Sequence, residues 1–172
     1  MKKRKNLRIK MIISDVDGVL TDGAIYIDQE GRRLRRFSVL DGVAFQMAHS
    51  VGLLTALVSS RHSPEVLSRA EELGIVEVHL GVRDKYATVD SITKKHGIKL
   101  GETCYIGDDL NDLRTLQNVG YSITVPEAPV ELRSIADYVS EKSGGEGAFR
   151  EAMEHILHNM GLYATACEKV AG

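Results

Sequence analysis

Short apolar runs alternate with amphipathic stretches along this chain. Each run is continuous rather than alternating with polar positions, which is typical of strands covered on both faces of a sheet. The runs lie at 11–13, 53–58, 76–80, 103–106, 121–125 and 136–139. We therefore expect six strands of a buried sheet.

Helical patterns fill the stretches between these strands. Apolar residues recur at helix spacing over 66–73, after Ser63 and Pro64, which favour a helix start. Gly74 favours the end of that helix, and a longer helix is predicted over 148–160. Repeated strand–helix–strand units imply right-handed crossovers and a parallel sheet. The predicted fold class is therefore α/β, a doubly wound Rossmann-like parallel sheet with helices on both faces.

One segment after the first strand departs from this pattern. Residues 24–27 and 32–37 flank a turn that contains Gly31, so we predict a β-hairpin insertion over about 23–38. Its second half holds four arginines in the five residues 32–36, which we interpret as a solvated or intersubunit strand rather than a nucleic-acid patch. No linker or repeat divides the chain, so we expect residues 1–172 to form a single domain, with a C-terminal tail after about residue 160.

Composition and charge exclude several classes of protein. The chain has 172 residues, 43% of them hydrophobic and 27% charged, so it can build a core. A net charge of −2 disfavours a nucleic-acid partner, and no apolar run approaches the roughly 20 residues of a membrane span. The basic start, 1–10, precedes only three apolar residues, which is not typical of a signal peptide. We therefore expect a cytoplasmic protein.

Chemically active side chains follow the predicted strands. Because ligands of an open parallel sheet bind outside the carboxyl ends of its strands, we expect these side chains to gather at one edge. They are, in chain order, Asp15 and Asp17 after the first strand, Ser59 at the end of the second, Lys85 after the third, and Asp108, Asp109 and Asp112 after the fourth.

The gathered carboxylates would repel one another unless a cation neutralised them. Two like charges about 4 Å apart cost about 4 kcal/mol at an effective dielectric constant near 20. Oxygen ligands without His or Cys favour Mg²⁺ over Zn²⁺, and Lys85 would add a second positive charge for a phosphate. An Asp-x-Asp-Gly segment alone also occurs in calcium loops and ordinary turns, but the further ligand positions of an EF-hand are missing from the sequence.

Four motifs thus stand in a fixed order: 15–23, Ser59, Lys85 and 107–112. They resemble the motifs of the haloacid dehalogenase superfamily of phosphohydrolases, and the resemblance covers nearly the whole chain. Within that superfamily, the group most similar is the 3-deoxy-D-manno-octulosonate 8-phosphate phosphatases, which have no cap domain. Further segments that are similar to this group are 37–42, Arg61 and 144–151.

The resemblance implies a two-step phosphoryl transfer. Asp15 would attack phosphorus and form an aspartyl phosphate. Asp17 would protonate the leaving alkoxide and then activate water. Ser59 and Lys85 would hold the phosphoryl oxygens, which completes the implied catalytic set.

The resemblance also implies a magnesium site. Mg²⁺ would be held by Asp15, the backbone carbonyl of Asp17, and Asp108. Asp109 and Asp112 would orient Lys85 or the waters of the metal.

Substrate binding and assembly are implied by the same resemblance. The implied substrate is a small sugar-acid phosphate. Arginines would bind the end of the substrate that carries the carboxylate. The gaps between the motifs hold no cap domain, so a neighbouring subunit of a homotetramer, associated through the hairpins, would cover each site. The implied substrate-binding residues are Ser38, Val39, Leu40, Asp41, Gly42, Gln46, Arg61, Arg69 and Lys85.

Several functions stay open at this point. The leading function is that of an Mg²⁺-dependent phosphatase for 3-deoxy-D-manno-octulosonate 8-phosphate. The resemblance implies that such an enzyme acts in the synthesis of lipopolysaccharide precursors. A phosphatase for a nine-carbon, sialic-acid-type 9-phosphate is the nearest alternative. A non-catalytic tetramerising module is disfavoured by the complete set of Asp15, Asp17, Lys85 and Asp108. A signalling receiver domain is disfavoured by Asp17 and by the hairpin.

Overall fold

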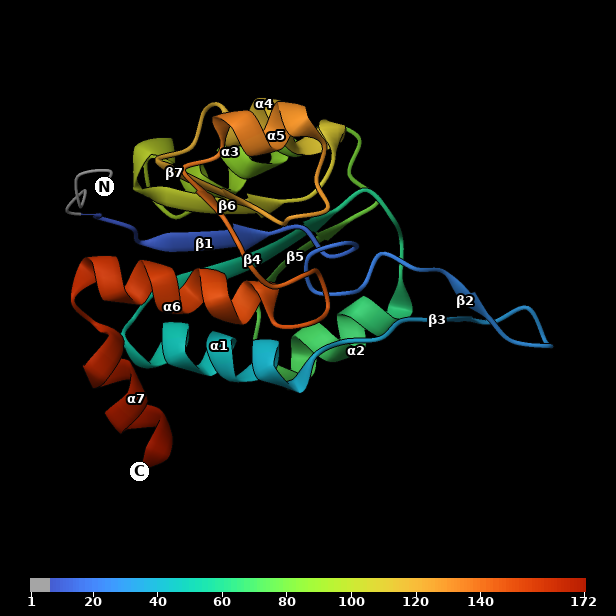
Figure 1. Ribbon diagram of the computed structural model, residues 1–172, viewed down its shortest axis with the longest axis horizontal. Coiled ribbons are helices and arrows are strands. Elements are labelled where there is room, and N and C mark those ends of the chain that lie inside the picture. The colour runs from blue at the N-terminus through green and yellow to red at the C-terminus, as the bar shows by residue number, and fades with distance from the viewer. Residues whose placement is uncertain (1–6) are drawn as a thin grey trace.

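A six-stranded parallel sheet runs through the centre of the molecule, in the order β5-β4-β1-β6-β7-β8 (Figure 1). This computed structural model describes residues 7–172, so most of the basic start of the chain lies outside the described residues. Each predicted apolar run forms one strand, which confirms the α/β fold class. The strands are β1 (Met11–Ser14), β4 (Leu54–Ser59), β5 (Glu77–Leu80), β6 (Thr103–Gly107), β7 (Tyr121–Thr124) and β8 (Tyr138–Val139).

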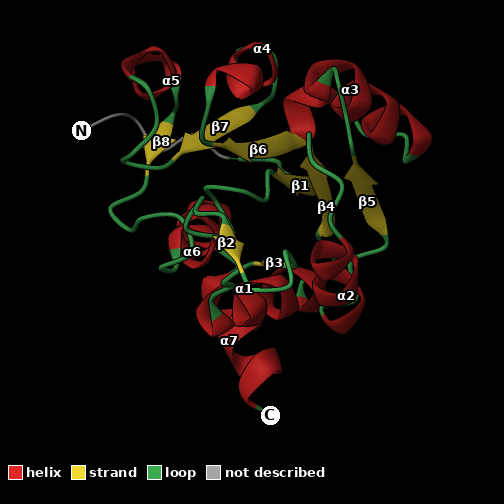
Figure 2. Ribbon diagram, turned by 90° about the vertical axis from the view of Figure 1, so that its right-hand side faces the viewer, coloured by secondary structure: helices red, strands yellow, loops and turns green. Residues whose placement is uncertain are grey.

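Helices cover both faces of this sheet (Figure 2). One face carries α3 (Lys85–Lys95), α4 (Leu113–Leu116) and α5 (Val130–Ile135). The other carries α1 (Val39–Ser50), α2 (Pro64–Glu72) and α6 (Ala148–Met160), and α7 (Tyr163–Ala171) packs against α1 and α6. Two 3₁₀ turns complete the elements, Leu100–Glu102 and Leu110–Asp112.

Side-chain caps define where two of these helices begin. The Oγ of Ser38 accepts the N–H of Leu40 at 3.2 Å at the start of α1. The Oδ1 of Asp84 accepts the N–H of Ala87 at 2.9 Å at the start of α3. Such caps satisfy N–H groups that have no partner inside the helix. The cap of α3 makes Lys85 its first residue, and this places Lys85 at the carboxyl edge of the sheet.

The core fills both sides of the sheet, against α1 and α6 on one face and against α3, α4 and α5 on the other. Strand β1 is wholly buried, as expected for a strand paired on both sides and covered on both faces. The rings of Phe45 in α1 and Phe149 in α6 stack with their centroids 4.2 Å apart. In the part of the chain that the structure describes, no helix is long and apolar enough to cross a membrane.

The hairpin projects from the carboxyl end of the sheet (Figure 1). It consists of the antiparallel strands β2 (Tyr26–Ile27) and β3 (Arg33–Leu34), which are shorter than predicted. After β3 the chain returns to the body of the protein, where Phe37 pairs with Thr21. The apolar side chains of Ile27 and Leu34 are exposed on the hairpin.

The structure adds detail at the start of α2, where the prediction is confirmed, and in the C-terminal tail. Ser63 stands at the N-cap position of α2, but its side chain makes no cap hydrogen bond, because its Oγ contacts Glu65 and Arg35 instead. The predicted tail after residue 160 contains the helix α7, which buries Ala166.

A cluster of basic groups surrounds Glu77 at the edge strand β5. The carboxylate accepts hydrogen bonds from Lys95 at 2.6 Å, from His96 at 2.7 Å and from His79 at 3.0 Å. Burial alone would raise the pKa of Glu77, but these three partners lower it to about 2. The ionised carboxylate therefore ties the end of α3 to the edge of the sheet.

We predict that the Glu77→Gln change lowers the free energy of unfolding by about 1–2 kcal/mol at neutral pH, after allowance for solvent screening of Lys95. The unfolded carboxyl, with a pKa near 4.5, takes up its proton before the folded one does. The difference between wild type and variant should therefore shrink as pH falls from about 4.5 towards 2. Urea unfolding at a series of pH values measures it. Glu71→Gln, at an exposed position on α2, is the matched control. A difference that stays constant with pH would contradict the role of the ionised cluster.

Candidate active site

Asp15 stands directly after β1, at the centre of the carboxyl edge of the sheet. Its N–H donates to the carbonyl of Ile106 at 2.9 Å, which continues the pairing of β1 with β6 past the last strand residue. Its carboxylate is buried, and Oδ1 accepts the N–H of Val16 at 2.6 Å. Oδ2 accepts Lys85 Nζ at 2.6 Å. The carboxylate is therefore held in one orientation by two donors.

Lys85 bridges two carboxylates from different parts of the fold. Its Nζ donates to Asp15 Oδ2 at 2.6 Å and to Asp112 Oδ1 at 2.7 Å, and only 1% of its side chain is exposed. Burial alone would lower the pKa of Lys85, but the charges of Asp15 and Asp112 raise it above its usual value. Lys85 is therefore a fixed positive charge inside the site.

Asp108 follows β6 and lies against the loop after β1. A Cβ on Gly18 would stand 1.9 Å from Asp108 Oδ2, and Gly18 has a φ of +83°. Both facts require glycine at this position, because any side chain would displace the Asp108 carboxylate. The glycine of the Asp-x-Asp-Gly motif thus allows the two acidic loops to meet.

Asp112 is fully buried and supports the loop that carries Asp108. Besides Lys85, it accepts the hydroxyl of Tyr105 at 2.6 Å and the N–H groups of Asp108 at 3.1 Å and Asp109 at 3.3 Å. Asp109 has a local role as well, because its Oδ1 accepts the N–H of Leu110 and caps the short turn that follows.

The electrostatics of the cluster fit a divalent cation. Ligand oxygens of Asp15, Asp108 and Asp112 all lie within 4.8 Å of one another. Burial and the charge of Asp112 raise the pKa of Asp15 to about 6, and burial and Asp15 raise that of Asp108 to about 8. Lys85 thus leaves part of the negative charge uncompensated. Because Asp112 already accepts four donors, Asp15 and Asp108 are the carboxylates able to bind a hard ion such as Mg²⁺.

Asp17 faces a different set of partners. Its Oδ1 accepts Arg35 Nε at 2.9 Å, and Arg61 Nε lies 3.9 Å from its Oδ2. Ser59, at the end of β4, is buried, and its Oγ accepts the N–H of Arg61 at 3.2 Å. One cavity of about 220 Å³ is bordered by all five residues predicted for catalysis and metal binding, which are Asp15, Asp17, Ser59, Lys85 and Asp108. Its other lining residues are Gly23, Ser60, Arg61, Asp109 and Asn111.

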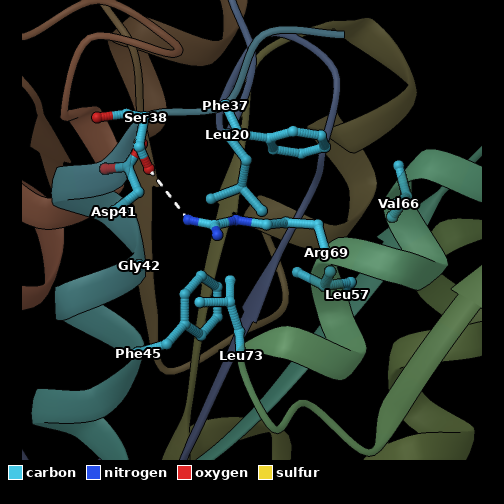
Figure 3. A pocket seen from close by; sticks show the side chains of 10 residues that line it. All are labelled: Leu20, Phe37, Ser38, Asp41, Gly42, Phe45, Leu57, Val66, Arg69 and Leu73. Atoms are coloured by element: carbon cyan, nitrogen blue, oxygen red, sulfur yellow. Dashed lines mark hydrogen bonds between the residues drawn. The ribbon is translucent and has the colours of Figure 1, made fainter. Parts of the chain in front are cut away.

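The predicted sugar-binding residues do not all gather at this cavity. Arg61 borders it, whereas Arg69 extends from α2 to α1, where its Nη2 donates to the carbonyl of Ser38 at 3.5 Å (Figure 3). A narrow pocket between these helices is lined by Ser38, Asp41, Gly42 and Arg69 (Figure 3).

The remaining residues of that predicted set lie on the surface. Val39 is 79% exposed, Gln46 is exposed on α1, and Leu40 lines a separate hollow beside α6. Within one chain, therefore, the predicted sugar-binding set is divided between the cavity, the pocket of Arg69 and the surface of α1.

Arg35 is a site residue that the sequence interpretation missed. The four arginines of 32–36 were interpreted as a solvated or intersubunit strand, and Arg32 is indeed 72% exposed. The side chain of Arg35, however, is only 6% exposed and contacts Asp17. Arg35 lies in a run of arginines, and no local sequence signal distinguishes it from the others. Its side chain points inward because the chain returns to the body of the protein after β3.

The glycine-rich loop before α6 packs onto the loop after β1. The N–H of Gly145 donates to the carbonyl of Val19 at 3.0 Å. A Cβ on Gly144 would stand 2.0 Å from the carbonyl oxygen of Gly18, and one on Gly145 would stand 2.5 Å from the backbone nitrogen of Asp22. Only glycine permits this contact, because the obstructing atoms are backbone. The two loops therefore fix each other.

Comparison with known proteins places this chain in one family. The model of a family of haloacid dehalogenase-like hydrolases matches residues 69–151. A 3-deoxy-D-manno-octulosonate 8-phosphate phosphatase of Haemophilus influenzae is 37% identical over 159 residues, 92% of this chain and 88% of the relative. The protein of that description from Escherichia coli K12 is 36% identical over 149 residues, 87% and 79% of the two chains.

Solved structures agree with these relatives. A 3-deoxy-D-manno-octulosonate 8-phosphate phosphatase of Moraxella catarrhalis, in complex with a magnesium ion, a phosphate ion and KDO, has a TM-score of 0.92 at 38% identity. The match covers 95% of this chain and 94% of that one. The cobalt-bound phosphatase of Haemophilus influenzae has a TM-score of 0.89 at 35% identity, covering 95% and 99%. The chain belongs to the haloacid dehalogenase-like hydrolases and, within them, to the family of 3-deoxy-D-manno-octulosonate 8-phosphate phosphatases.

We predict that Gly144→Ala lowers the free energy of unfolding by about 1–3 kcal/mol, because its Cβ would collide with the backbone of Gly18. Chemical denaturation measures this loss. Gly101→Ala is the matched control, since its Cβ would meet no atom within 4 Å and should change stability by about 0.5 kcal/mol or less. Equal effects of the two changes would show that the loop contact is not tight.

Proposed function

We propose that this chain is an Mg²⁺-dependent phosphatase that hydrolyses 3-deoxy-D-manno-octulosonate 8-phosphate through an aspartyl phosphate on Asp15. The observation that supports it most directly is the meeting of Asp15, Asp108 and Lys85 at one cavity. The relative from Moraxella catarrhalis, with magnesium, phosphate and KDO bound, supports both the cofactor and the class of substrate.

The first step is transfer of the phosphoryl group to Asp15. A carboxylate oxygen of Asp15 attacks phosphorus, and the bond between phosphorus and the sugar oxygen breaks as the new bond forms. Asp17 gives its proton to the leaving alkoxide, which departs as an alcohol. Lys85 and the hydroxyl of Ser59 bind the phosphoryl oxygens, whose charge is stabilised in the buried cavity.

The second step releases phosphate. Asp17, now a carboxylate, takes a proton from water as that water attacks phosphorus. The bond between phosphorus and the Asp15 oxygen breaks, which restores the carboxylate of Asp15. One acid–base residue therefore serves both steps and ends in its starting state.

The metal would be held by the carboxylates of Asp15 and Asp108 and by the backbone carbonyl of Asp17. When bound, Mg²⁺ supplies positive charge that reduces repulsion between the Asp15 carboxylate and the anionic phosphate. Asp112 supports this arrangement from behind, through Lys85 and the N–H groups of Asp108 and Asp109.

The substrate site of our proposal involves more than one subunit. Arg61 borders the catalytic cavity and is suited to a sugar carboxylate. The exposed apolar side chains of Ile27 and Leu34 suit a hairpin that associates with its copies in a homotetramer. In such an assembly, residues of α1 such as Leu40 and Gln46 would contribute from the surface.

A phosphate-release assay over several esters tests the substrate. We expect 3-deoxy-D-manno-octulosonate 8-phosphate to give a higher kcat/KM than a nine-carbon sugar-acid 9-phosphate or an aldose phosphate, and removal of Mg²⁺ by a chelator to abolish release. Arg61→Gln should reduce the ratio of kcat/KM for the sugar-acid phosphate to that for an aldose phosphate by about tenfold or more. A loss of this size is expected when a charge-assisted hydrogen bond to the substrate is removed. A higher kcat/KM for the nine-carbon ester would contradict the proposed substrate. If no ester released phosphate, the proposal of a phosphatase would be refuted.

Trapping of the intermediate tests the nucleophile. We expect Asp15→Asn to lower kcat by about 10³-fold or more, as loss of a nucleophile does. With p-nitrophenyl phosphate, whose leaving group needs no proton, Asp17→Asn should complete the first step and stall at the second. Intact-mass spectrometry should then find one added phosphoryl group, mapped to Asp15 by peptide analysis. The double variant with Asp15→Asn is the control and should gain none. A phosphoryl group on another residue would overturn the role of Asp15.

A further inference from the structure

Arg35 connects the hairpin to the catalytic cavity. It follows β3, at the point where the chain returns to the body of the protein, and its side chain turns inward to 6% exposure. Nε donates to Asp17 Oδ1 at 2.9 Å, and Nη1 donates to Ser63 Oγ at 2.7 Å. The guanidinium therefore spans the gap between the loop after β1 and the start of α2.

A second layer of contacts holds Arg35 itself. The Oγ of Ser63 donates to Glu65 at 2.5 Å, and the Glu65 carboxylate lies 3.5 Å from Arg35 Nη1. This explains why Ser63 does not cap α2 with its side chain. A buried arginine with a carboxylate on each side is confined to one orientation, because its planar donors have fixed directions.

The contact with Asp17 uses one carboxyl oxygen and leaves the other available. Oδ1 accepts the N–H of Arg35, while Oδ2 has Arg61 Nε as its neighbour at 3.9 Å, beyond hydrogen-bond distance. Oδ1 can accept this N–H whether or not Oδ2 carries a proton, since it remains an acceptor in both states. Arg35 can therefore hold the carboxyl in place throughout a cycle in which Oδ2 gives and takes a proton.

We propose that Arg35 is a positioning residue for Asp17. Arg35 holds the Asp17 carboxyl by Oδ1, so that Oδ2 faces the leaving oxygen of the substrate. This inference rests on the proposed function, because it assumes that Asp17 is the acid of a phosphatase. It adds a contribution of the hairpin to the chemical step, since Arg35 belongs to the segment that follows β3 and leads from the hairpin back to the body of the protein. Displacement of a proton donor by even a small distance weakens catalysis strongly.

The dependence of the rate on the leaving group tests this role. The quantity to measure is kcat/KM, which covers the steps up to departure of the alcohol. An alkyl phosphate, such as the sugar-acid phosphate, needs a proton from Asp17, whereas p-nitrophenyl phosphate does not. We expect Arg35→Gln to lower kcat/KM about tenfold to a hundredfold for the alkyl ester and less than about threefold for the aryl ester.

Three further variants make the test specific. Arg35→Lys keeps the charge without the two-directional fork, so it should show the same selective loss to a smaller extent; it also serves if Arg35→Gln does not fold. In an Asp17→Asn background, Arg35→Gln should cause no further loss for the alkyl ester, because the group that it positions is gone. Arg32→Gln, which removes an exposed arginine of the same hairpin, is the matched control and should leave both esters unaffected.

The outcomes separate this inference from the proposed function. Equal losses for the two esters would mean that Arg35 only supports the fold, and no loss would mean that its contact with Asp17 is irrelevant; either result overturns the inference. A wild-type protein that releases phosphate from neither ester would instead refute the proposed function. Mass measurement of the assembly for each variant shows whether a loss comes from dissociation of subunits, which would lower the rates for both esters together.

Discussion

The ion pairs of Lys85 with Asp15 and Asp112 are the interaction on which the site depends. They join three separate parts of the chain: the end of β1, the first residue of α3, and the turn after β6. Removing one partner of such a buried pair typically costs about 3–5 kcal/mol, because the other charge is left without compensation. In the proposed function, the same charge that binds the loops together would also bind a phosphoryl oxygen. Stability and chemistry would then use the same lysine.

Close approach of backbone is the second constraint, and glycine provides it. Gly18 lets Asp108 reach the loop of Asp15, and Gly107 does the same for Asp112, whose Cγ would lie 2.5 Å from a Cβ there. Gly144 lets the loop before α6 cover the loop after β1. The acidic motifs thus contain glycine for a steric reason, since side chains on these residues would displace carboxylates whose oxygens lie within 4.8 Å of one another.

The two aspartates of the first motif are held from opposite directions. Lys85 holds Asp15 from α3, while Arg35 holds Asp17 from the hairpin side. This division suits the proposed two-step reaction, in which the nucleophile and the acid must be placed independently. It also connects the hairpin to Asp17, because Arg35 lies directly after β3 and its side chain contacts that carboxylate.

Much of this architecture follows from the sequence alone. Continuous apolar runs predicted the parallel strands, and their carboxyl ends predicted where Asp15, Ser59, Lys85 and Asp108 would meet, because a parallel sheet brings those ends to one edge. The sequence did not reveal the inward turn of Arg35, or that the predicted sugar-binding residues are divided between the cavity, the pocket of Arg69 and the surface of α1. Those features depend on how the hairpin, α1 and α2 pack against the sheet, and the direction of a long side chain is decided by its neighbours in space rather than by its neighbours along the chain.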